Sequence, residues 1–301
     1  MRWQRGLLIY NDKAGHDNLE KHLSGCLPVL ARNINEFLLL KTQKQGDAAD
    51  FCRQYGEEMD VVFVLGGDGT VHECINGLAG LEKRPLFGIL PGGTCNDFSR
   101  TLNISQNITQ AAEQMVLGEY ADVDIGTDGN HYFLNFWGIG LIAETSINID
   151  PDEKKRLGKI SYFISMLRTV KEMDPFPFKM VYDGKVLEDE AVMILAANGK
   201  FIGTSQIPAP LIEINDGLLD IIIVKNSSLS LFREVFEMKR SVSEITEEEA
   251  GILYFQAKSF SIYTHEQMDV DSDGEVYMKT PSEIHVLPKH IQILCGTESL
   301  L

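Results

Sequence analysis

Three turns of this chain carry residues whose types and spacing could do chemistry. They are G-G-D-G-T at 66–70, P-G-G-T-C-N-D at 91–97 and D-V-D-S-D-G-E at 269–275. Glycines have no Cβ, so the backbone N–H groups of the first two turns can approach a phosphate closely. The acids of the third turn concentrate negative charge, which attracts a cation or an electropositive substrate. What the third turn does therefore depends on what the first two bind.

The acidic turn matches a calcium-binding EF-hand loop only in its first half. Positions one, three, five and six of that loop are filled by Asp269, Asp271, Asp273 and Gly274. Position twelve is Thr280, where an EF-hand needs a bidentate Glu, and the flanking residues have strand character rather than helix character. We therefore interpret Asp273-Gly274-Glu275 as a turn that presents a catalytic carboxylate, and Asp269 and Asp271 as solvated charge.

The first glycine turn follows a strand-like run, V-F-V-L, and precedes a helix-like one. It lacks the Lys of a Walker loop, and Gly67-x-Gly69 is not followed by the third glycine of a dinucleotide fingerprint. H-E-C-I-N at 72–76 also lacks the second His of a zinc protease. A tight strand-to-helix turn without any ligand is the alternative. Asp68 favours a ligand, because a carboxylate beside a phosphate requires a divalent cation between them.

The second glycine turn repeats this design. Gly92 and Gly93 turn the chain after a strand, and Thr94 offers a hydroxyl group. We expect Asn96 or Asp97 to cap a new helix, and Arg100 to pair with Asp97 or to meet a phosphate. A helix cap and a surface ion pair are the structural alternative for this segment.

The segments around these turns alternate between strand and helix patterns. Apolar runs predict buried strands at 7–11, 36–41, 61–66 and 86–90, and helical spacing occurs at 18–32, 47–58, 70–81 and 107–118. This order predicts a parallel sheet with crossover helices. Ligands of such sheets bind at the carboxyl ends of the strands, where the glycines lie.

The pattern changes after about residue 121. Strand-like runs occur at 132–137, 179–182, 192–197, 219–224, 259–263 and 283–287, punctuated by D-G and N-G turns. They predict an antiparallel sandwich, with helical inserts at 152–172 and 229–241 and a last run, 291–295, that returns to the first domain. The predicted domains are residues 1–124 with 289–301, and residues 125–288.

The composition limits the classes of partner that the protein can bind. The net charge of −17 disfavours nucleic-acid binding, because neutralising phosphates needs a positive field. No apolar run approaches the ~20 residues of a membrane span, and the start M-R-W-Q-R has no apolar stretch of a signal peptide after it. Five cysteines without a C-x-x-C pair argue against a disulfide framework or a zinc site. We expect a cytoplasmic protein.

At its two glycine turns the chain resembles the diacylglycerol kinase catalytic-domain family, in particular soluble bacterial lipid kinases. G-G-D-G-T-V-H-E-C-I-N-G-L and P-G-G-T-C-N-D-F-S-R correspond to the two signature blocks of that family. A lone G-G-D-G-T would also suit NAD kinases, but N-D-F-S-R favours the lipid branch. The resemblance covers essentially the whole chain. It implies an α/β nucleotide-binding domain with a mainly parallel sheet, then an antiparallel β-sandwich domain, with the active site in the interdomain cleft.

The resemblance also implies roles for matching residues. Nucleotide-site roles fall on Asn11, Lys13, Gly15, Thr42, Gly66, Gly67, Asp68, Gly69, Thr70, Glu73, Thr94, Asn96, Asp97 and Arg100. Asp124 matches an acid that joins a network of metal and water. Glu213, Asp216 and the Leu218 carbonyl match the ligands of a structural Mg²⁺; without the resemblance, D-G at 216–217 would be only a hairpin turn.

The first loop departs from the family pattern. N-P-x-S-G reads N-D-K-A-G here, so Asp12 replaces a proline, and His16 stands where Lys is common. Lys13 can compensate for the lost positive charge. His72 replaces a commoner Asn.

The resemblance predicts a kinase that uses ATP and Mg²⁺ to phosphorylate a lipid hydroxyl, most simply that of diacylglycerol. Asp68, Asp97, Asp273 and Glu275 are the expected catalytic residues, with Glu275 as the base and Asp273 orienting it. Other acceptors, such as phosphatidylglycerol, a sphingoid base or a polyisoprenoid, remain open, as does a nucleotide-binding regulator without turnover. The resemblance also implies a homodimer.

The lipid must be reached from the inner face of the membrane without a membrane span. The basic cluster K-K-R-L-G-K at 154–159 and the apolar residues after it form one candidate contact, with a solvated turn before an ordinary core helix as the alternative.

Overall fold

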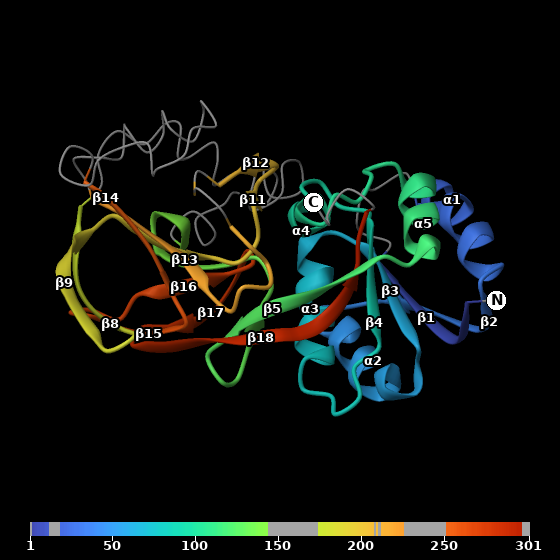
Figure 1. Ribbon diagram of the computed structural model, residues 1–301, viewed down its shortest axis with the longest axis horizontal. Coiled ribbons are helices and arrows are strands. Elements are labelled where there is room, and N and C mark those ends of the chain that lie inside the picture. The colour runs from blue at the N-terminus through green and yellow to red at the C-terminus, as the bar shows by residue number, and fades with distance from the viewer. Residues whose placement is uncertain are drawn as a thin grey trace. The chain divides into compact units, whose positions relative to one another are not determined.

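The computed structural model describes residues 2–11, 19–143, 174–207, 209, 212–225 and 251–296. The chain folds into two compact units (Figure 1), one made of residues up to Val123 and from Lys289 onward, the other of Asp124–Pro288. The predicted helices at 152–172 and 229–241, the basic cluster at 154–159, and Lys13 and Gly15 lie outside the described residues.

The first unit is a parallel sheet with helices. Its strands β1 to β4 are Trp3–Asn11, Ile34–Thr42, Val61–Gly66 and Leu86–Pro91. Its helices α1 to α5 are Leu19–Ala31, Asp47–Tyr55, Asp68–Leu78, Asp97–Thr101 and Ile108–Leu117, and a 3₁₀ turn, η1, covers Gly56–Glu58. The strand order is β2-β1-β3-β4, and all three pairings are parallel, which confirms the predicted fold of this half.

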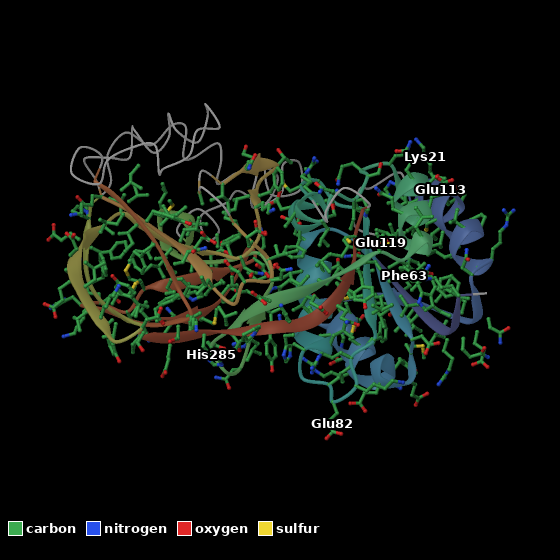
Figure 2. The ribbon with its side chains drawn as sticks, in the orientation of Figure 1. Lys21, Phe63, Glu82, Glu113, Glu119 and His285 are labelled. Atoms are coloured by element: carbon green, nitrogen blue, oxygen red, sulfur yellow. The ribbon has the colours of Figure 1, made fainter. Side chains whose placement is uncertain are left out.

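Burial explains why these runs form strands. Every residue of β3 is buried, as a parallel strand covered on both faces requires, and Figure 2 shows Phe63 inside this unit while Lys21, Glu82 and Glu113 project outward. Helix α1 packs against α5, and α2 packs against α3. The second contact is close because Gly77 has no side chain: a Cβ there would lie 2.5 Å from the Ala49 carbonyl oxygen.

The second unit is built from antiparallel strands. One sheet has the order β14-β13-β10-β7-β16-β17, formed by Ile252–Ala257, Leu219–Val224, Met193–Ala197, Phe136–Gly140, Asp269–Ser272 and Glu275–Lys279. The other strands are β6 (Tyr132–Phe133), β8 (Phe176–Tyr182), β9 (Lys185–Ala191), β11 (Phe201–Ile202), β12 (Ser205–Gln206) and β15 (Ser259–Thr264). Trp137 and Phe260 meet edge to face in its core, with ring centroids 5.2 Å apart. The predicted antiparallel sandwich is confirmed.

Two strands, β5 (Tyr120–Thr127) and β18 (Ser282–Leu294), contribute residues to both units. The sequence predicted two separate runs at 283–287 and 291–295, whereas the structure has one 13-residue strand. Its first part pairs with β15, and its Ile293 pairs with Phe87 of β4 in parallel.

Other boundaries differ locally. The run predicted as one strand at 132–137 is interrupted between β6 and β7. The helix predicted at 47–58 ends at Tyr55 and continues only as η1, and α3 begins at Asp68, two residues earlier than predicted. The strands β9 and β14 were not predicted, because charged residues along K-V-L-E-D-E-A hide the strand pattern of the first. No helix within the described ranges has the length and apolarity to cross a bilayer.

Candidate functional site

The carboxyl edge of the parallel sheet gathers several predicted site residues. Asn11 ends β1 and lies in register with Thr42, which ends β2. The Asn11 side-chain amide donates to Thr70 Oγ1 at 3.4 Å, which links the end of β1 to the first turn of α3. Because the strand order reverses between β1 and β3, this edge is a topological switch point, where ligands of such sheets bind.

The two glycine turns lie at this edge in direct backbone contact. The Gly92 N–H donates to the Gly66 carbonyl at 2.9 Å. A Cβ added to Gly93 would lie 2.4 Å from the Gly67 Cα, closer than a Cβ ever approaches. The glycines at these positions are therefore required by the contact between the turns, in addition to any role at a phosphate.

Asp68 fastens the two turns together. Its carboxylate oxygens accept hydrogen bonds from the backbone N–H groups of Asn96, at 3.0 Å, and Asp97, at 2.7 Å. Asn96 is the N-cap residue of α4, which confirms one of the two expected positions, but its side chain does not make the expected cap. Asn96 has a left-handed backbone (φ 54°) and makes no side-chain cap, because its carboxamide bonds the N–H and carbonyl of Gly93, at 2.8 and 3.0 Å.

A potential cation site lies at the same place. One ligand atom from each of Asp68, Cys95 and Asp97 falls within 4.8 Å of the others, and the Asp97 side chain is fully buried. Two carboxylates this close suit Mg²⁺, which binds proteins through one or two carboxylates while keeping several waters. Arg100 donates through Nε to the Cys95 carbonyl at 2.9 Å, a contact that the sequence did not suggest.

Two further predicted residues flank this edge. Glu73, on α3, accepts the Ala48 N–H of α2 at 3.3 Å, so it joins the two helices. Thr94 is exposed in the second turn.

In the second unit, Asp273 and Gly274 form a two-residue hairpin turn between β16 and β17. Both have positive φ, 54° and 87°, which is the type I′ geometry that Asp-Gly favours. The Asp273 carboxylate accepts three backbone N–H groups, from Leu134 at 2.8 Å, Asn135 at 2.8 Å and Phe136 at 2.9 Å. These bonds explain the break between β6 and β7, since the three amides face Asp273 at this point.

The interpretation of Asp271 as solvated charge is wrong. Its side chain is only 1% exposed, and it accepts the Gly274 N–H at 2.7 Å, so it fixes the hairpin turn from inside. Asp269 is partly exposed and pairs with Lys279 across the hairpin at 3.0 Å. Glu275, the predicted base, is the first residue of β17 and is partly buried. The flanks of this turn are strands, as expected.

The segment predicted to hold a structural metal lies close to Asp124. The Asp124 side chain is fully buried and accepts the Gly217 N–H at 2.6 Å, while Asp216 accepts the Leu218 N–H at 3.0 Å. Burial raises the pKa of neighbouring Asp220 to about 6, and the negative charges of Asp216 and Glu213 add to this, against a hydrogen bond from Tyr254. Such an excess of carboxylates fits a bound cation.

Sequence reasoning missed Asn135 and Asn198, which surround the Asp273 turn. The Asn198 side-chain amide donates to the carbonyls of Asp124, at 2.9 Å, and Leu134, at 2.7 Å. The Asn135 side chain donates to the Phe201 carbonyl at 2.8 Å. The only signal was N-G at 198–199, which we interpreted as an ordinary turn.

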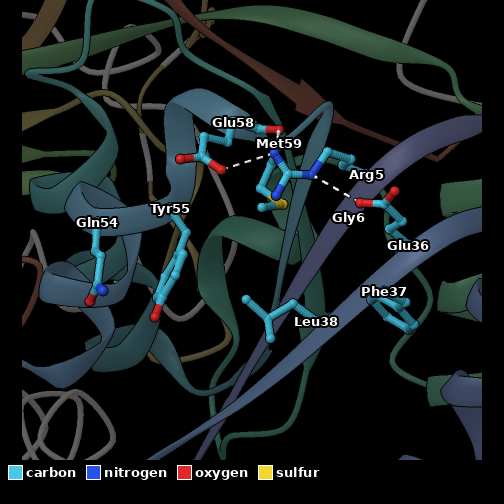
Figure 3. A pocket seen from close by; sticks show the side chains of 9 residues that line it. All are labelled: Arg5, Gly6, Glu36, Phe37, Leu38, Gln54, Tyr55, Glu58 and Met59. Carbon is cyan, nitrogen blue, oxygen red and sulfur yellow. Dashed lines mark hydrogen bonds and ion pairs between the residues drawn. The ribbon is translucent and has the colours of Figure 1, made fainter.

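Two pockets are lined by other residues, except that Asp269 of the acidic turn also lines the second. One, of about 420 Å³, lies near the amino end of β1 (Figure 3), where Arg5 pairs with Glu36 at 3.3 Å and Glu58 at 2.9 Å. Arg5 precedes Asn11 by six residues, roughly 20 Å along a strand, so this pocket is remote from the glycine turns. The other, of about 470 Å³, lies in the second unit and includes Gly140, Phe176 and Met268.

Comparisons with known proteins cover nearly the whole chain. The diacylglycerol kinase catalytic domain profile matches residues 5–127, and that of the YegS C-terminal NAD kinase beta sandwich-like domain matches residues 139–295. A protein of Staphylococcus aureus strain Mu3, named "Putative lipid kinase", is 36% identical over 300 residues, 97% of each chain.

Solved structures agree. A crystal structure described as "a putative diacylglycerol kinase from Bacillus anthracis str. Sterne" is 42% identical, with a TM-score of 0.91 over 100% of this chain and 98% of the other. Another, described as a diacylglycerol kinase of the same strain, is 41% identical, with a TM-score of 0.89 over 99% and 98%. The chain therefore belongs to the diacylglycerol kinase catalytic-domain family and has the two-domain architecture of its lipid kinases.

Proposed function

We propose that this protein uses MgATP to phosphorylate the hydroxyl group of a membrane lipid, with diacylglycerol as the acceptor and phosphatidic acid as the product. The observation that supports this most directly is the pair of interlocked glycine turns, with Asp68 and Asp97 side by side at the switch point of the sheet. Membership of the lipid kinase family supports it independently.

The residues of the first unit would hold the nucleotide. In the turn at 66–70, the backbone around Gly67 and Gly69 would approach phosphate oxygens closely, because these residues have no Cβ. The N–H groups of Thr70, Gly92 and Gly93 are instead used within the protein, where they hold the two turns in shape. Asp68 and Asp97 would hold Mg²⁺, which supplies neutralisation of the phosphate charge. Asp68 also holds the second turn in place, so one residue sets both the position of the backbone donors and the location of negative charge.

Glu275 would accept the proton of the attacking lipid hydroxyl. It follows the rigid type I′ turn, whose backbone is fixed by Asp271 from within and by the Asp273 clamp on Leu134–Phe136. The fixed backbone sets the point from which the Glu275 side chain projects, and a general base must lie within hydrogen-bond reach of the proton that it accepts. In this scheme Asp273 is a positioning residue.

The proposal is tested with purified protein, radiolabelled ATP and a panel of lipids read by thin-layer chromatography. The panel contains diacylglycerol, phosphatidylglycerol, a sphingoid base and a polyisoprenol. Labelled phosphatidic acid is the expected product. Label on another lipid would keep the kinase and change its acceptor, whereas no labelled lipid at all would overturn the proposal in favour of a nucleotide-binding regulator.

The variant Glu275→Gln tests the base within the same assay. Because positioned proton transfer contributes about 100- to 10,000-fold, its kcat should fall by that factor while ATP binding, measured by calorimetry, stays near that of the unmodified protein. Glu283→Gln on β18, an exposed acid, is the matched control and should keep full activity. Full activity of Glu275→Gln would remove Glu275 from the mechanism.

A further inference from the structure

A continuous set of hydrogen bonds joins the Glu213–Leu218 segment to the turn that carries Glu275. The Gly217 N–H donates to Asp124 Oδ2. The Asn198 side-chain amide donates to the Asp124 and Leu134 carbonyls. The Leu134 N–H in turn donates to Asp273 Oδ2. Every bond lies between 2.6 and 2.9 Å. Asn198 is its centre, because its one amide group contacts Asp124 and Leu134, both more than 60 residues away from it in the sequence.

Asn198 is held in this position by hydrogen bonds as well as by packing. Its side chain is fully buried, and its backbone N–H donates to the Asn135 carbonyl at 2.9 Å. A larger residue after it would have to displace the Asn135 carboxamide, since a Cβ at Gly199 would lie 1.7 Å from Asn135 Oδ1. The backbone N–H groups of the Asn-Gly pair both donate to the Asn135 carbonyl, so the pair is bonded directly to the segment whose amides donate to Asp273.

Four buried polar atoms of the second unit have no hydrogen-bond partner in the protein among the described residues. Among the described residues, the buried atoms Asn135 Oδ1, Asn198 Oδ1, Ser272 Oγ and Trp137 Nε1 make no hydrogen bond to the protein. Ser272 and Trp137 face each other in register on β16 and β7, immediately before the Asp273 turn. Buried polar atoms of this kind are ordinarily satisfied by ordered internal water in proteins.

We infer that Asn198 is a positioning residue for the phosphoryl-transfer reaction, which holds the Leu134–Phe136 segment, and through it the Asp273–Glu275 turn, in register with Asp124. The inference rests on the proposed function, because it assumes that Glu275 is the base. It assigns Asn198 no contact with the substrate. Replacing Asn198 should therefore lower the rate of the chemical step and leave the affinity for the nucleotide nearly unchanged.

The test compares Asn198→Ala and Asn198→Asp with Asn130→Asp, an exposed asparagine of the same unit. Small displacements of a reacting group cost up to about 100-fold in rate, so kcat of Asn198→Ala should fall about 10- to 100-fold while the KM for ATP changes less than about twofold. A protonated Asn198→Asp carboxyl has one O–H and can donate to one of the two carbonyls, whereas the ionised carboxylate can donate to neither. Relative to the unmodified protein, its residual kcat should therefore rise as the pH falls from 8 to 6, whereas Asn130→Asp should follow the unmodified profile.

A second measurement does not depend on activity. Hydrogen exchange of the Leu134, Asn135 and Phe136 amides should accelerate in Asn198→Ala, while exchange in β3 stays as in the unmodified protein. Unchanged kcat and unchanged exchange in both Asn198 variants would overturn the inference. If Asn198→Ala does not fold, the isosteric Asn198→Asp carries the test. A protein that phosphorylates no lipid would refute the proposed function, and the exchange result would still decide whether Asn198 holds the segment.

Discussion

Single carboxylates of this protein fix backbone as well as carrying charge. Asp68 holds the second glycine turn, Asp271 holds the hairpin turn from inside, and Asp273 holds three amides of another segment. Each carboxylate oxygen has more than one acceptor site, so an acid can clamp a loop and still face a cation. Because these carboxylates accept backbone N–H groups, acids that the sequence suggests as exposed cation ligands are partly or wholly buried.

The contact between the glycine turns is sensitive to a single methyl group. In Gly93→Ala the new Cβ would meet the Gly67 Cα, so we expect about 1–3 kcal/mol less unfolding free energy and at least about tenfold weaker ATP binding. Thermal unfolding and calorimetry measure both effects. Gly80→Ala is the matched control, because nothing lies within 4 Å of a Cβ there. Equal behaviour of the two variants would show that the turns can separate without cost.

At the scale of residues, the sequence identified which residue types the site uses, but it did not predict which contacts these residues make. The glycine turns could be predicted from Gly66–Gly69 and Gly92–Gly93, since turns depend on local backbone conformation. The roles of Asn135 and Asn198 could not, because each contacts residues distant in the sequence. Asp271 was misjudged for the same reason.

At the scale of elements, His290 connects the last part of β18 to helix α3 within the first unit. The His290 Nε2 lies 2.8 Å from the Ala79 carbonyl oxygen at the end of α3. Burial, together with the positive charge of Arg84, lowers the pKa of His290 below its ordinary value of 6.5, against the effect of the Ala79 bond. A neutral ring is therefore the form that fits the fold.

This pKa shift predicts a pH-dependent stability. As the pH falls from above 6.5, His290 is protonated in the unfolded chain before it is protonated in the folded one, so this contribution to stability is lost progressively. His290→Gln keeps a donor for Ala79 and should show a smaller fall in unfolding free energy between pH 7.5 and 5, measured by urea titration. His285→Gln, at an exposed position of the same strand (Figure 2), should keep the slope of the unmodified protein; an equal slope in all three would contradict the assignment.

Strands and helices with strong local patterns were predicted almost as they occur. β3 and α5 are examples: β3 matches the predicted 61–66, and α5 has Asn107 as its N-cap and a left-handed Gly118 after it. β6 and β7 were predicted as a single strand, because the interruption between them is caused by Asp273, over 130 residues later.

At the scale of the whole molecule, the net charge of −17 makes bound cations a natural source of stability. Glu213 and Asp216 already raise the pKa of Asp220 through their charge, secondary to burial. The metal site at Glu213, Asp216 and Leu218, and the placement of the active site in an interdomain cleft, stay predictions.

A thermal measurement tests the metal site. Mg²⁺ at about 100 times its dissociation constant stabilises a protein by about 2.7 kcal/mol, so Mg²⁺ should raise the melting temperature by several degrees and EDTA should reverse the change. Asp216→Asn should reduce this rise, whereas Glu82→Gln, at an exposed loop position (Figure 2), should not. An equal Mg²⁺ response in Asp216→Asn would place the cation elsewhere, with Asp68 and Asp97 as the next candidates.

The sequence by itself determined the two-part architecture, the parallel and antiparallel sheets, the glycine turns and the family of the protein. Hydrophobic period and turn chemistry act over a few residues, so they can be read without the fold. Only the tertiary structure decided what the acids do. Asp68 reaches the second turn, Asp273 reaches Leu134–Phe136, and Asn198 reaches Asp124, and these contacts exist only after distant segments have packed and excluded water from the groups between them.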